Sequence, residues 1–243
     1  MLVINGVTGS LGEATLKLAL EKGQKTVGVG RNTSKLTEFA KLYSDSTFIQ
    51  LKDISSEVEA KLLLEQIESI TKEKISMYIH AAATLKRTNS PLETSIENFE
   101  ETLSVNLTSA FVWNKSVMAK MIENQVHGSI LNVASQAART GGFGGTTSYA
   151  ASKGGLISLS KSFARFGALH NIRVNTVSPG FIDNPMMLEG LTSEQISDFV
   201  QKTAIKRLAT NSEIAEVCLF ILGTGASYIT GENIEVSAGQ VLG

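Results

Sequence analysis

The chain has 243 residues, of which 42% are hydrophobic and 19% charged, which suits one globular α/β domain and excludes a disordered chain. The net charge of −1 argues against nucleic acid or an anionic membrane as a partner, and the single cysteine, Cys218, excludes an internal disulfide. No uncharged apolar run reaches the roughly 18 residues of a spanning helix, and no signal-peptide pattern opens the chain, so we expect a cytoplasmic protein.

Short β-branched runs alternate with longer segments that have apolar residues at helical spacing. The expected strands are Leu2–Asn5, Thr26–Gly30, Thr47–Leu51, Ser76–His80, Ser129–Ala134, Arg173–Val177 and Asn233–Val236. Strands that alternate with helices form a parallel sheet covered on both faces, because the crossovers are right-handed. We therefore predict a single α/β domain over residues 1–243, a doubly wound Rossmann-type sheet of about seven strands.

A glycine-rich turn follows the first expected strand and precedes a helix. Glycines let the backbone turn tightly and approach a pyrophosphate, whose charge the helix N-terminus stabilises. This context predicts a dinucleotide site; the alternative is a tight turn without a ligand. The residues concerned are Gly6, Thr8, Gly9, Ser10, Leu11 and Gly12.

The ends of the second and third strands indicate the type of dinucleotide. An acid after the second strand would bind a ribose 2′-hydroxyl, but Arg31 and Asn32 stand there, and an Arg accommodates a 2′-phosphate. We therefore expect NADPH (NADP+) in preference to NADH; the alternative is a solvated Arg31. Asp53 ends the third strand and either accepts a hydrogen bond from the adenine amino group or caps the next helix, whose start Ser55 indicates.

Tyr149 and Lys153 are four residues apart in an expected helix, so their side chains share one face. A free phenol has a pKa near 10 and is a poor base at neutral pH. A neighbouring ammonium favours the phenolate, so we expect Lys153 to lower the pKa of Tyr149 toward the range of acid/base catalysis. The alternative is an ordinary helix face.

Two further polar residues lie where a catalytic site needs them. Ser135 ends an apolar strand, where its hydroxyl would hold a substrate carbonyl oxygen beside Tyr149; the alternative is a turn or cap serine. Asn106 interrupts a long helical pattern, where Asn is unfavourable, which suggests a packing or functional reason. The alternative for Asn106 is an exposed helix position.

In this order and at these spacings, the residues resemble the compact single-domain branch of the short-chain dehydrogenase/reductase family, and most of all its 3-oxoacyl-[acyl-carrier-protein] reductases. The resemblance covers essentially the whole chain. It implies the catalytic residues Asn106, Ser135, Tyr149 and Lys153. It implies cofactor contacts from the turn at residues 5–12 and from Asp53, Ile54, Ala81, Tyr149, Lys153, Pro179, Gly180, Ile182 and Asn184.

The resemblance also implies a mechanism, in which NADPH delivers hydride to a ketone or a 3-oxoacyl thioester. Tyr149 then protonates the oxygen, Ser135 orients it, Lys153 holds the nicotinamide ribose and Asn106 positions a water. Residues 185–201 are expected to form a lid over an apolar substrate, with ordinary helix packing as the alternative. The tail at residues 226–236 is similar to the segment through which the family usually forms a homotetramer.

Departures from the family pattern bear on the cofactor and the partner. Val126 and His170 occupy two positions that are basic in carrier-protein reductases, which puts the acyl carrier protein in doubt. Unusual residues at the cofactor site are Asn5 and Ser10 in the turn, His80 to Ala83 after the fourth strand, and Asn184 in the nicotinamide loop.

Other functions stay open at this point. The same site would serve a dehydrogenase acting on a sugar, polyol or steroid-like alcohol, or a cofactor-binding sensor without turnover. His80, His127 and His170 lack metal-ligand spacing, so no metal site is expected.

Overall fold

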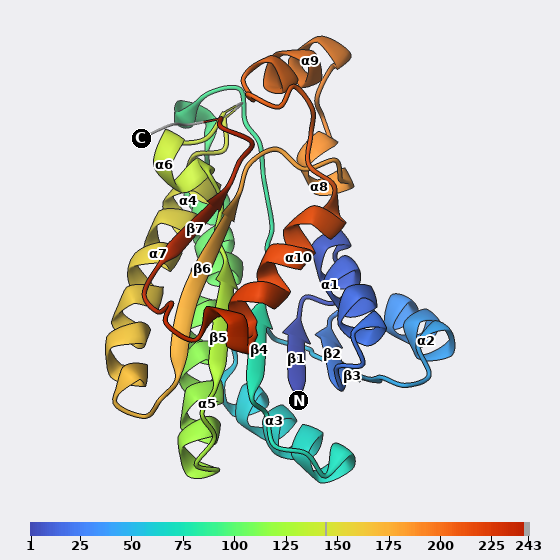
Figure 1. Ribbon diagram of the computed structural model, residues 1–243. Helices are drawn as coiled ribbons and strands as arrows, with labels where there is room; N and C mark the ends of the chain where they lie inside the picture. The colour runs from blue at the N-terminus through green and yellow to red at the C-terminus, as the bar shows by residue number, and fades with distance from the viewer. Residues whose placement is uncertain (144, 241–243) are drawn as a thin grey trace.

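The computed structural model describes residues 1–143 and 145–240; Gly144 and residues 241–243, which the domain prediction includes, lie outside the described residues. All strands are parallel and form one sheet in the order β3-β2-β1-β4-β5-β6-β7 (Figure 1). The strands are β1 (Leu2–Asn5), β2 (Thr26–Gly30), β3 (Thr47–Gln50), β4 (Met77–His80), β5 (Ser129–Val133), β6 (Arg173–Pro179) and β7 (Asn233–Val236). The predicted doubly wound sheet is confirmed, and no strand end differs from its prediction by more than two residues.

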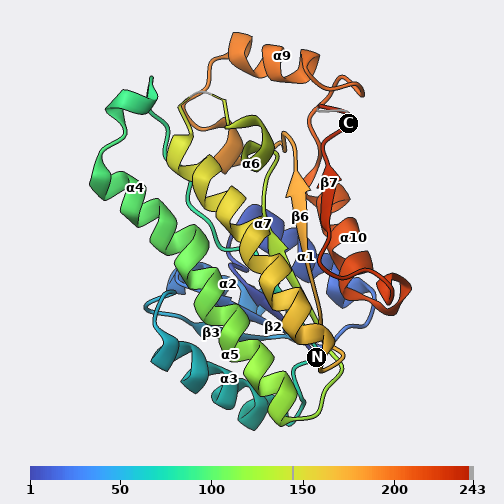
Figure 2. The ribbon, with the colours of Figure 1, turned by 90° about the vertical axis from the view of Figure 1, so that its left-hand side faces the viewer.

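Helices cover both faces of the sheet (Figures 1 and 2). One face carries α3 (Glu57–Thr71), α5 (Ser109–Glu123) and α7 (Thr147–Ala168), and the other carries α1 (Ser10–Glu21), α2 (Thr33–Leu42) and α10 (Asn211–Leu222). The remaining helices are α4 (Ile96–Leu103), α6 (Ala137–Thr140), α8 (Pro185–Leu188) and α9 (Ser193–Gln201), with short 3₁₀ turns at Pro91–Glu93 and Thr224–Ala226.

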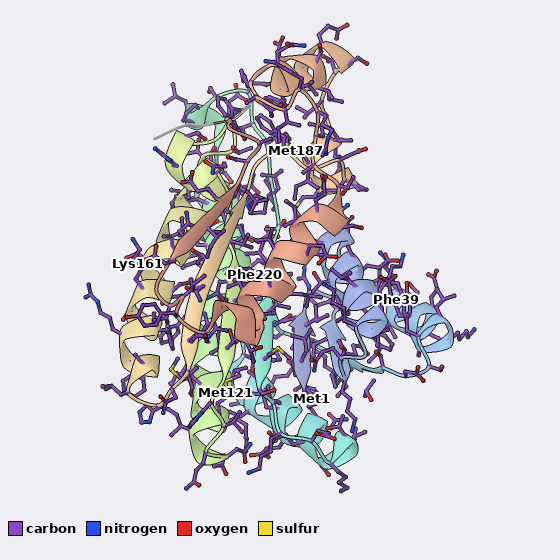
Figure 3. All side chains as sticks on the ribbon, viewed as in Figure 1. Met1, Phe39, Met121, Lys161, Met187 and Phe220 are labelled. Atoms are coloured by element: carbon purple, nitrogen blue, oxygen red, sulfur yellow. The ribbon has the colours of Figure 1, made fainter. Side chains whose placement is uncertain are left out.

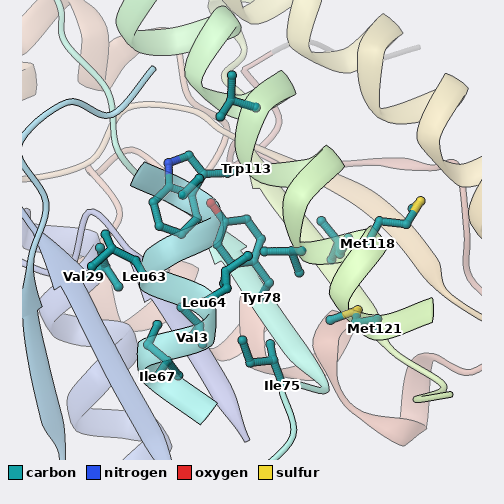
Figure 4. Close-up of a cluster of buried hydrophobic side chains, with 14 of the residues drawn as sticks. Val3, Val29, Leu63, Leu64, Ile67, Ile75, Tyr78, Trp113, Met118 and Met121 are labelled. Atoms are coloured by element: carbon teal, nitrogen blue, oxygen red, sulfur yellow. The ribbon is translucent and has the colours of Figure 1, made fainter. Parts of the chain in front are cut away.

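Each face of the sheet buries its own apolar core. Under α3 and α5, the Trp113 ring stacks on Tyr78 with ring centres 6.0 Å apart (Figure 4). Under α1 and α10, Leu16 and Cys218 are fully buried, and burial raises the pKa of the Cys218 thiol to about 12. A thiol in this state is a packing group and not a nucleophile.

The topology places a crevice at one end of the sheet. From β1 the chain runs outward through β2 and β3, then returns to the other side of β1 to form β4. Ligands of such sheets bind at the carboxyl ends of the strands where the order reverses. That point lies between Asn5, which ends β1, and His80, which ends β4, and α8 and α9 lie above this end of the sheet (Figure 1).

Candidate active site

The turn after β1 needs glycine for two separate reasons. A Cβ on Gly6, whose φ is +87°, would lie 2.5 Å from the Ala82 nitrogen, and one on Gly12 would lie 2.2 Å from the Gly6 oxygen. These two glycines therefore serve the packing of the fold. A Cβ on Gly9 would meet nothing nearer than 3.4 Å, so the protein itself leaves room there. A glycine at that position suits the close approach of a ligand.

The N-terminus of α1 opens into the same space. Its N-cap residue, Gly9, supplies no side-chain cap, so first-turn amides are left for another acceptor. Lys35, which the sequence analysis missed, donates from Nζ to the Thr8 carbonyl oxygen at 2.8 Å and pairs with Glu13. An uncapped helix N-terminus behind a glycine turn fits a pyrophosphate.

Two adjoining hollows, of about 160 and 230 Å³, make up the crevice. They share the four lining residues Gly9, Ala81, Ala83 and Met186. The hollow of about 230 Å³, called the outer hollow, is lined by these predicted residues: Gly6, Thr8, Gly9, Arg31, Asn32, Ile54 and Ala81. The hollow of about 160 Å³, called the inner hollow, is lined by these predicted residues: Gly9, Ser10, Leu11, Gly12, Ala81, Ser135, Tyr149, Lys153, Pro179, Gly180, Ile182 and Asn184. Of the predicted site residues, only Asp53 and Asn106 line neither hollow.

The prediction that Ser55 starts the third helix is wrong. Asp53 is exposed, and its Oδ1 accepts hydrogen bonds from the backbone nitrogen and the hydroxyl of Ser55, both at 2.9 Å. The N-cap of α3 is instead Ser56, which accepts from the Glu59 nitrogen. Asp53 therefore closes the turn before the helix and does not cap the helix itself.

The outer hollow has the electrostatic character of an anion site. Arg31 is exposed at its rim, and Asn32 caps α2 by accepting from the Lys35 nitrogen at 3.0 Å. Of the described residues that line this hollow, none carries a carboxylate. A 2′-phosphate would thus meet a guanidinium and no like charge.

The inner hollow brings Ser135, Tyr149 and Lys153 together. Ser135 follows β5, and its Oγ accepts from the Ala137 nitrogen at 3.1 Å. Tyr149 lies in the first turn of α7, and Lys153 lies one turn later on the same face. The Lys153 ammonium is buried, donates to the Val133 carbonyl oxygen at 2.7 Å, and lies 5.5 Å from the centre of the Tyr149 ring.

The expectation that Lys153 lowers the pKa of Tyr149 is wrong for the protein without cofactor. Burial raises the phenol pKa, and an interaction with Ser135 and the charge of Arg87 offset this only in part. Burial also lowers the pKa of Lys153 to about 7, so its own charge is weakened. The residues alone thus keep Tyr149 protonated at neutral pH.

Asn106 lies in a π-helical turn, Ser104–Thr108, that joins α4 to α5. Its side chain is fully buried, so the alternative of an exposed position is wrong. The amide accepts from the Thr84 nitrogen at 2.8 Å, and it donates to the Thr84 oxygen at 2.9 Å and to Ser152 Oγ at 3.0 Å. Asn106 therefore ties the segment after β4 to α7 and positions both walls of the inner hollow.

The unusual residues Asn5 and His80 form a chain of buried hydrogen bonds behind the crevice. Asn5 donates to the Tyr78 hydroxyl at 3.2 Å, which lies 2.9 Å from His80 Nδ1. Ser109 Oγ donates to the Val105 oxygen, so it accepts from His80 Nε2, 3.1 Å away. Burial lowers the pKa of His80 to about 3, which keeps this ring neutral. The chain adds side-chain hydrogen bonds to the backbone pairing of β1 with β4 and links β4 to the π-helical turn and α5.

The predicted lid at residues 185–201 comprises α8 and α9. Met186, Met187 and Phe199 line the inner hollow, and Figure 3 labels Met187 at α8. Phe199 stacks on Phe181 with ring centres 4.4 Å apart. The side chain of Asn184, predicted to face the cofactor, accepts from the Met187 nitrogen at 2.9 Å and caps α8.

Arg87 and Gln136 also line the inner hollow, and the sequence analysis missed both. Arg87 donates from Nη2 to the Met187 oxygen at 2.7 Å. Alternating side chains after β4 would have pointed to Arg87, since Ala81, Ala83 and Leu85 precede it on the same side. Within the described ranges, no three His, Cys, Asp or Glu residues lie close enough to hold a metal ion, and no helix has the length and hydropathy to cross a membrane.

Comparisons with known proteins agree with this geometry. Residues 6–240 match a family model described as enoyl-(acyl carrier protein) reductase. The 3-oxoacyl-[acyl-carrier-protein] reductase FabG of Rickettsia conorii is 30% identical over 240 residues, 99% of this chain and 96% of that protein. FabG of Buchnera aphidicola is 32% identical over 245 residues, with the same coverage. A crystal structure of a short chain dehydrogenase from Bacillus anthracis superposes with a TM-score of 0.88 at 24% identity, over 100% of this chain and 97% of that one. The chain therefore belongs to the short-chain dehydrogenase/reductase family.

Proposed function

We propose that the protein is an NADPH-dependent carbonyl reductase. The observation that carries the proposal is the meeting of Ser135, Tyr149 and Lys153 in the same crevice as the uncapped N-terminus of α1. A binding-only protein would have no need of a phenol, a hydroxyl and a buried ammonium at the inner end of its dinucleotide site. The chain is also similar over nearly its whole length to proteins named as 3-oxoacyl-[acyl-carrier-protein] reductases. This similarity supports an enzyme over a sensor.

The chemistry follows from the protonation states. The substrate carbonyl oxygen accepts hydrogen bonds from the hydroxyls of Tyr149 and Ser135, which polarise the carbonyl. Because burial raises the pKa of Tyr149, the phenol holds its proton and donates it as the oxygen gains charge. Lys153, fixed by Val133, places a cation beside the phenolate that is left, which then regains a proton from solvent. NADPH, when bound, supplies the hydride that the carbonyl carbon accepts.

The residues present fit the phosphorylated cofactor. The open space at Gly9 and the uncapped helix suit the pyrophosphate, and Arg31 faces the outer hollow without a neighbouring carboxylate among its described lining residues. The reverse reaction, alcohol oxidation, needs Tyr149 as a base. The raised pKa of the phenol leaves little phenolate to serve as that base at neutral pH.

A homotetramer remains part of the proposal. Phe111 on α5 is 44% exposed, and Phe166 on α7 is 52% exposed, which leaves apolar rings on the outer helices of one face. Trp113 and Met118, by contrast, are buried in the core. Light scattering coupled to size-exclusion chromatography measures the mass of the assembly directly. A monomer at micromolar concentration would contradict the homotetramer.

The test measures oxidation of NADPH and of NADH with acetoacetyl-CoA, methyl acetoacetate and crotonyl-CoA as acceptors. We expect turnover of the ketones with NADPH and slower turnover with NADH. Turnover of crotonyl-CoA alone would assign enoyl reduction, the activity in the name of the matching family model. NADPH binding without turnover of any ketone would contradict a reductase, and failure to bind either cofactor would show that the altered glycine turn disables the site.

A further inference from the structure

The inner hollow contains a cation that the proposed reduction does not use. After β4 the chain is extended, and Ala81, Ala83, Leu85 and Arg87 successively line the hollow. Lys86, between the last two, turns the other way and pairs with Glu101 and Asn98 of α4. Lys86 is therefore neutralised by Glu101 outside the hollow, whereas the adjacent Arg87 faces the inside of the hollow.

Arg87 is held firmly in that position. On one side, Thr84 is bonded through both backbone groups to Asn106, and on the other, the Thr88 nitrogen donates to the Gly145 oxygen at 3.2 Å. The guanidinium itself donates to the Met187 oxygen at 2.7 Å. A side chain anchored in this way offers its remaining N–H donors in a fixed direction.

Among the described residues, the charge of Arg87 has no acidic partner. Its side chain is half-buried, and none of the ion pairs formed by residues 1–143 and 145–240 includes it. The described lining of the inner hollow contains Arg87 and Lys153 as cations and no Asp or Glu. A half-buried cation without a partner is unfavourable, so an anionic ligand would be stabilised there.

Gln136 supplies a second, independent observation. The residue is 3% exposed, directly follows Ser135 and lines the same hollow. Neither its side-chain oxygen nor its nitrogen has a hydrogen-bond partner within the part of the chain that the structure describes. Buried amides are nearly always paired, so this one is suited to a polar group of the ligand. A purely hydrocarbon chain would leave both Gln136 and Arg87 unsatisfied.

We propose that the substrate is an oxo acid, a ketone with a free carboxylate that Arg87 binds and with Gln136 as a further polar contact. This inference rests on the proposed reductase function and narrows its substrate class. Arg87 and Tyr149 line the same hollow, so the carboxylate and the carbonyl that Tyr149 protonates belong to one small ligand. Leu85, Met186 and Phe199 leave apolar walls for a short hydrocarbon part.

The experiment compares charged ketones with neutral analogues of the same size. Pyruvate, acetoacetate and levulinate are assayed with NADPH beside their methyl esters, in the wild type, Arg87→Met, Arg87→Lys and Lys86→Met. We expect at least one acid to exceed its ester in kcat/KM. Arg87→Met should lower kcat/KM for that acid by about ten- to hundredfold, mainly through KM, and change the ester little. Arg87→Lys should restore part of the loss, and Lys86→Met should behave as wild type.

Several outcomes would overturn the inference. Esters reduced as well as every acid, or equal losses for acid and ester in Arg87→Met, would show that Arg87 only holds the lid. A matching loss of NADPH affinity in Arg87→Met would assign the guanidinium to the cofactor. In each case turnover of the esters leaves the reductase function standing. Absence of turnover with all ketones, including acetoacetyl-CoA, would instead contradict the proposed function itself.

Discussion

The ammonium of Lys153 lies 5.5 Å from the centre of the Tyr149 ring, and its hydrogen bond goes to the backbone of β5, at Val133, 2.7 Å away. The two catalytic candidates are therefore neighbours on one face of α7, and Lys153 is held in addition by a strand of the sheet. Lys153 is buried and Tyr149 is half-buried, and burial is the largest influence on both groups: it raises the pKa of the phenol and lowers the pKa of the ammonium.

Lys153 should make the stability of the cofactor-free protein depend on pH. Its pKa is about 7 in the folded protein and 10.5 in its ordinary state. Between these values the unfolded chain binds the proton that the folded chain releases, so stability rises with pH across this window by up to about 1.4 kcal/mol per pH unit. Denaturant unfolding of the wild type and of Lys153→Met, at several pH values above neutrality, measures the difference between the two proteins.

The free energy of unfolding of the wild type should rise relative to that of Lys153→Met as the pH increases from about 7 to 10.5. The substitution removes the titrating group, so all other groups cancel in the comparison. A difference that stays constant with pH would show that Lys153 keeps its ordinary pKa despite burial.

The reductive reaction should keep its rate through neutral pH. Tyr149 must be protonated to act as an acid, and its pKa lies above the ordinary value of 10.0. We therefore expect kcat/KM for a neutral ketone such as methyl acetoacetate to show no loss from this group below about pH 9. Arg87→Met removes a charge that lowers the phenol pKa, so any alkaline limb should move to higher pH. A falling limb near neutrality that persists whichever ketone is used would contradict the assignment.

Two glycines of the turn should respond differently to alanine. Gly9→Ala meets ordinary packing, so it should leave the free energy of unfolding nearly unchanged and weaken NADPH binding by about 1.5–3 kcal/mol, because phosphate contacts are displaced. Gly12→Ala places its Cβ 2.2 Å from the Gly6 oxygen and should destabilise the fold by about 1–3 kcal/mol or more. Thermal unfolding and calorimetric titration separate the two effects. Equal NADPH affinity in Gly9→Ala and the wild type would show that the pyrophosphate does not bind at this turn.

Arg31 should determine the preference between the two nicotinamide cofactors. Arg31→Ser is expected to weaken NADPH binding by about 1.5–3 kcal/mol and to leave NADH binding unchanged, because only NADPH carries the 2′-phosphate. Arg165→Ser, at an exposed position near the end of α7, is the matched control for loss of one positive charge. Parallel losses for both cofactors, or no loss for either, would place the 2′-phosphate elsewhere.

Local patterns predicted the fold and the inner end of the site well. β-branched runs such as Arg173–Val177 are buried strands because a covered parallel sheet requires apolar residues on both faces. Ser135, Tyr149 and Lys153 meet because β5 ends, and α7 begins, at the same edge of the sheet. The helical spacing of Tyr149 and Lys153 predicted their shared face, and the family resemblance added Ser135 to them.

Properties set by long-range contacts were not predictable from the sequence. The pKa of Tyr149 depends on burial at a hollow whose lining comes from distant parts of the chain, and the role of Asn106 depends on its bonds to Thr84, 22 residues earlier. Ser55 fits the composition of a helix cap, but its bond to Asp53 moved the cap to Ser56. The alternation of side chains after β4 would have pointed to Arg87, but only the structure shows that this segment lines the hollow.

The central claim, that Tyr149 is the acid of a carbonyl reductase, is tested most directly by Tyr149→Phe. We would measure kcat with the best ketone alongside NADPH affinity and thermal stability. General acid catalysis predicts a fall in kcat of about 10²–10⁴-fold, with cofactor affinity and stability close to wild type, since the ring and its packing remain. A variant that keeps its kcat while binding NADPH normally would contradict the claim and assign the proton transfer to another group.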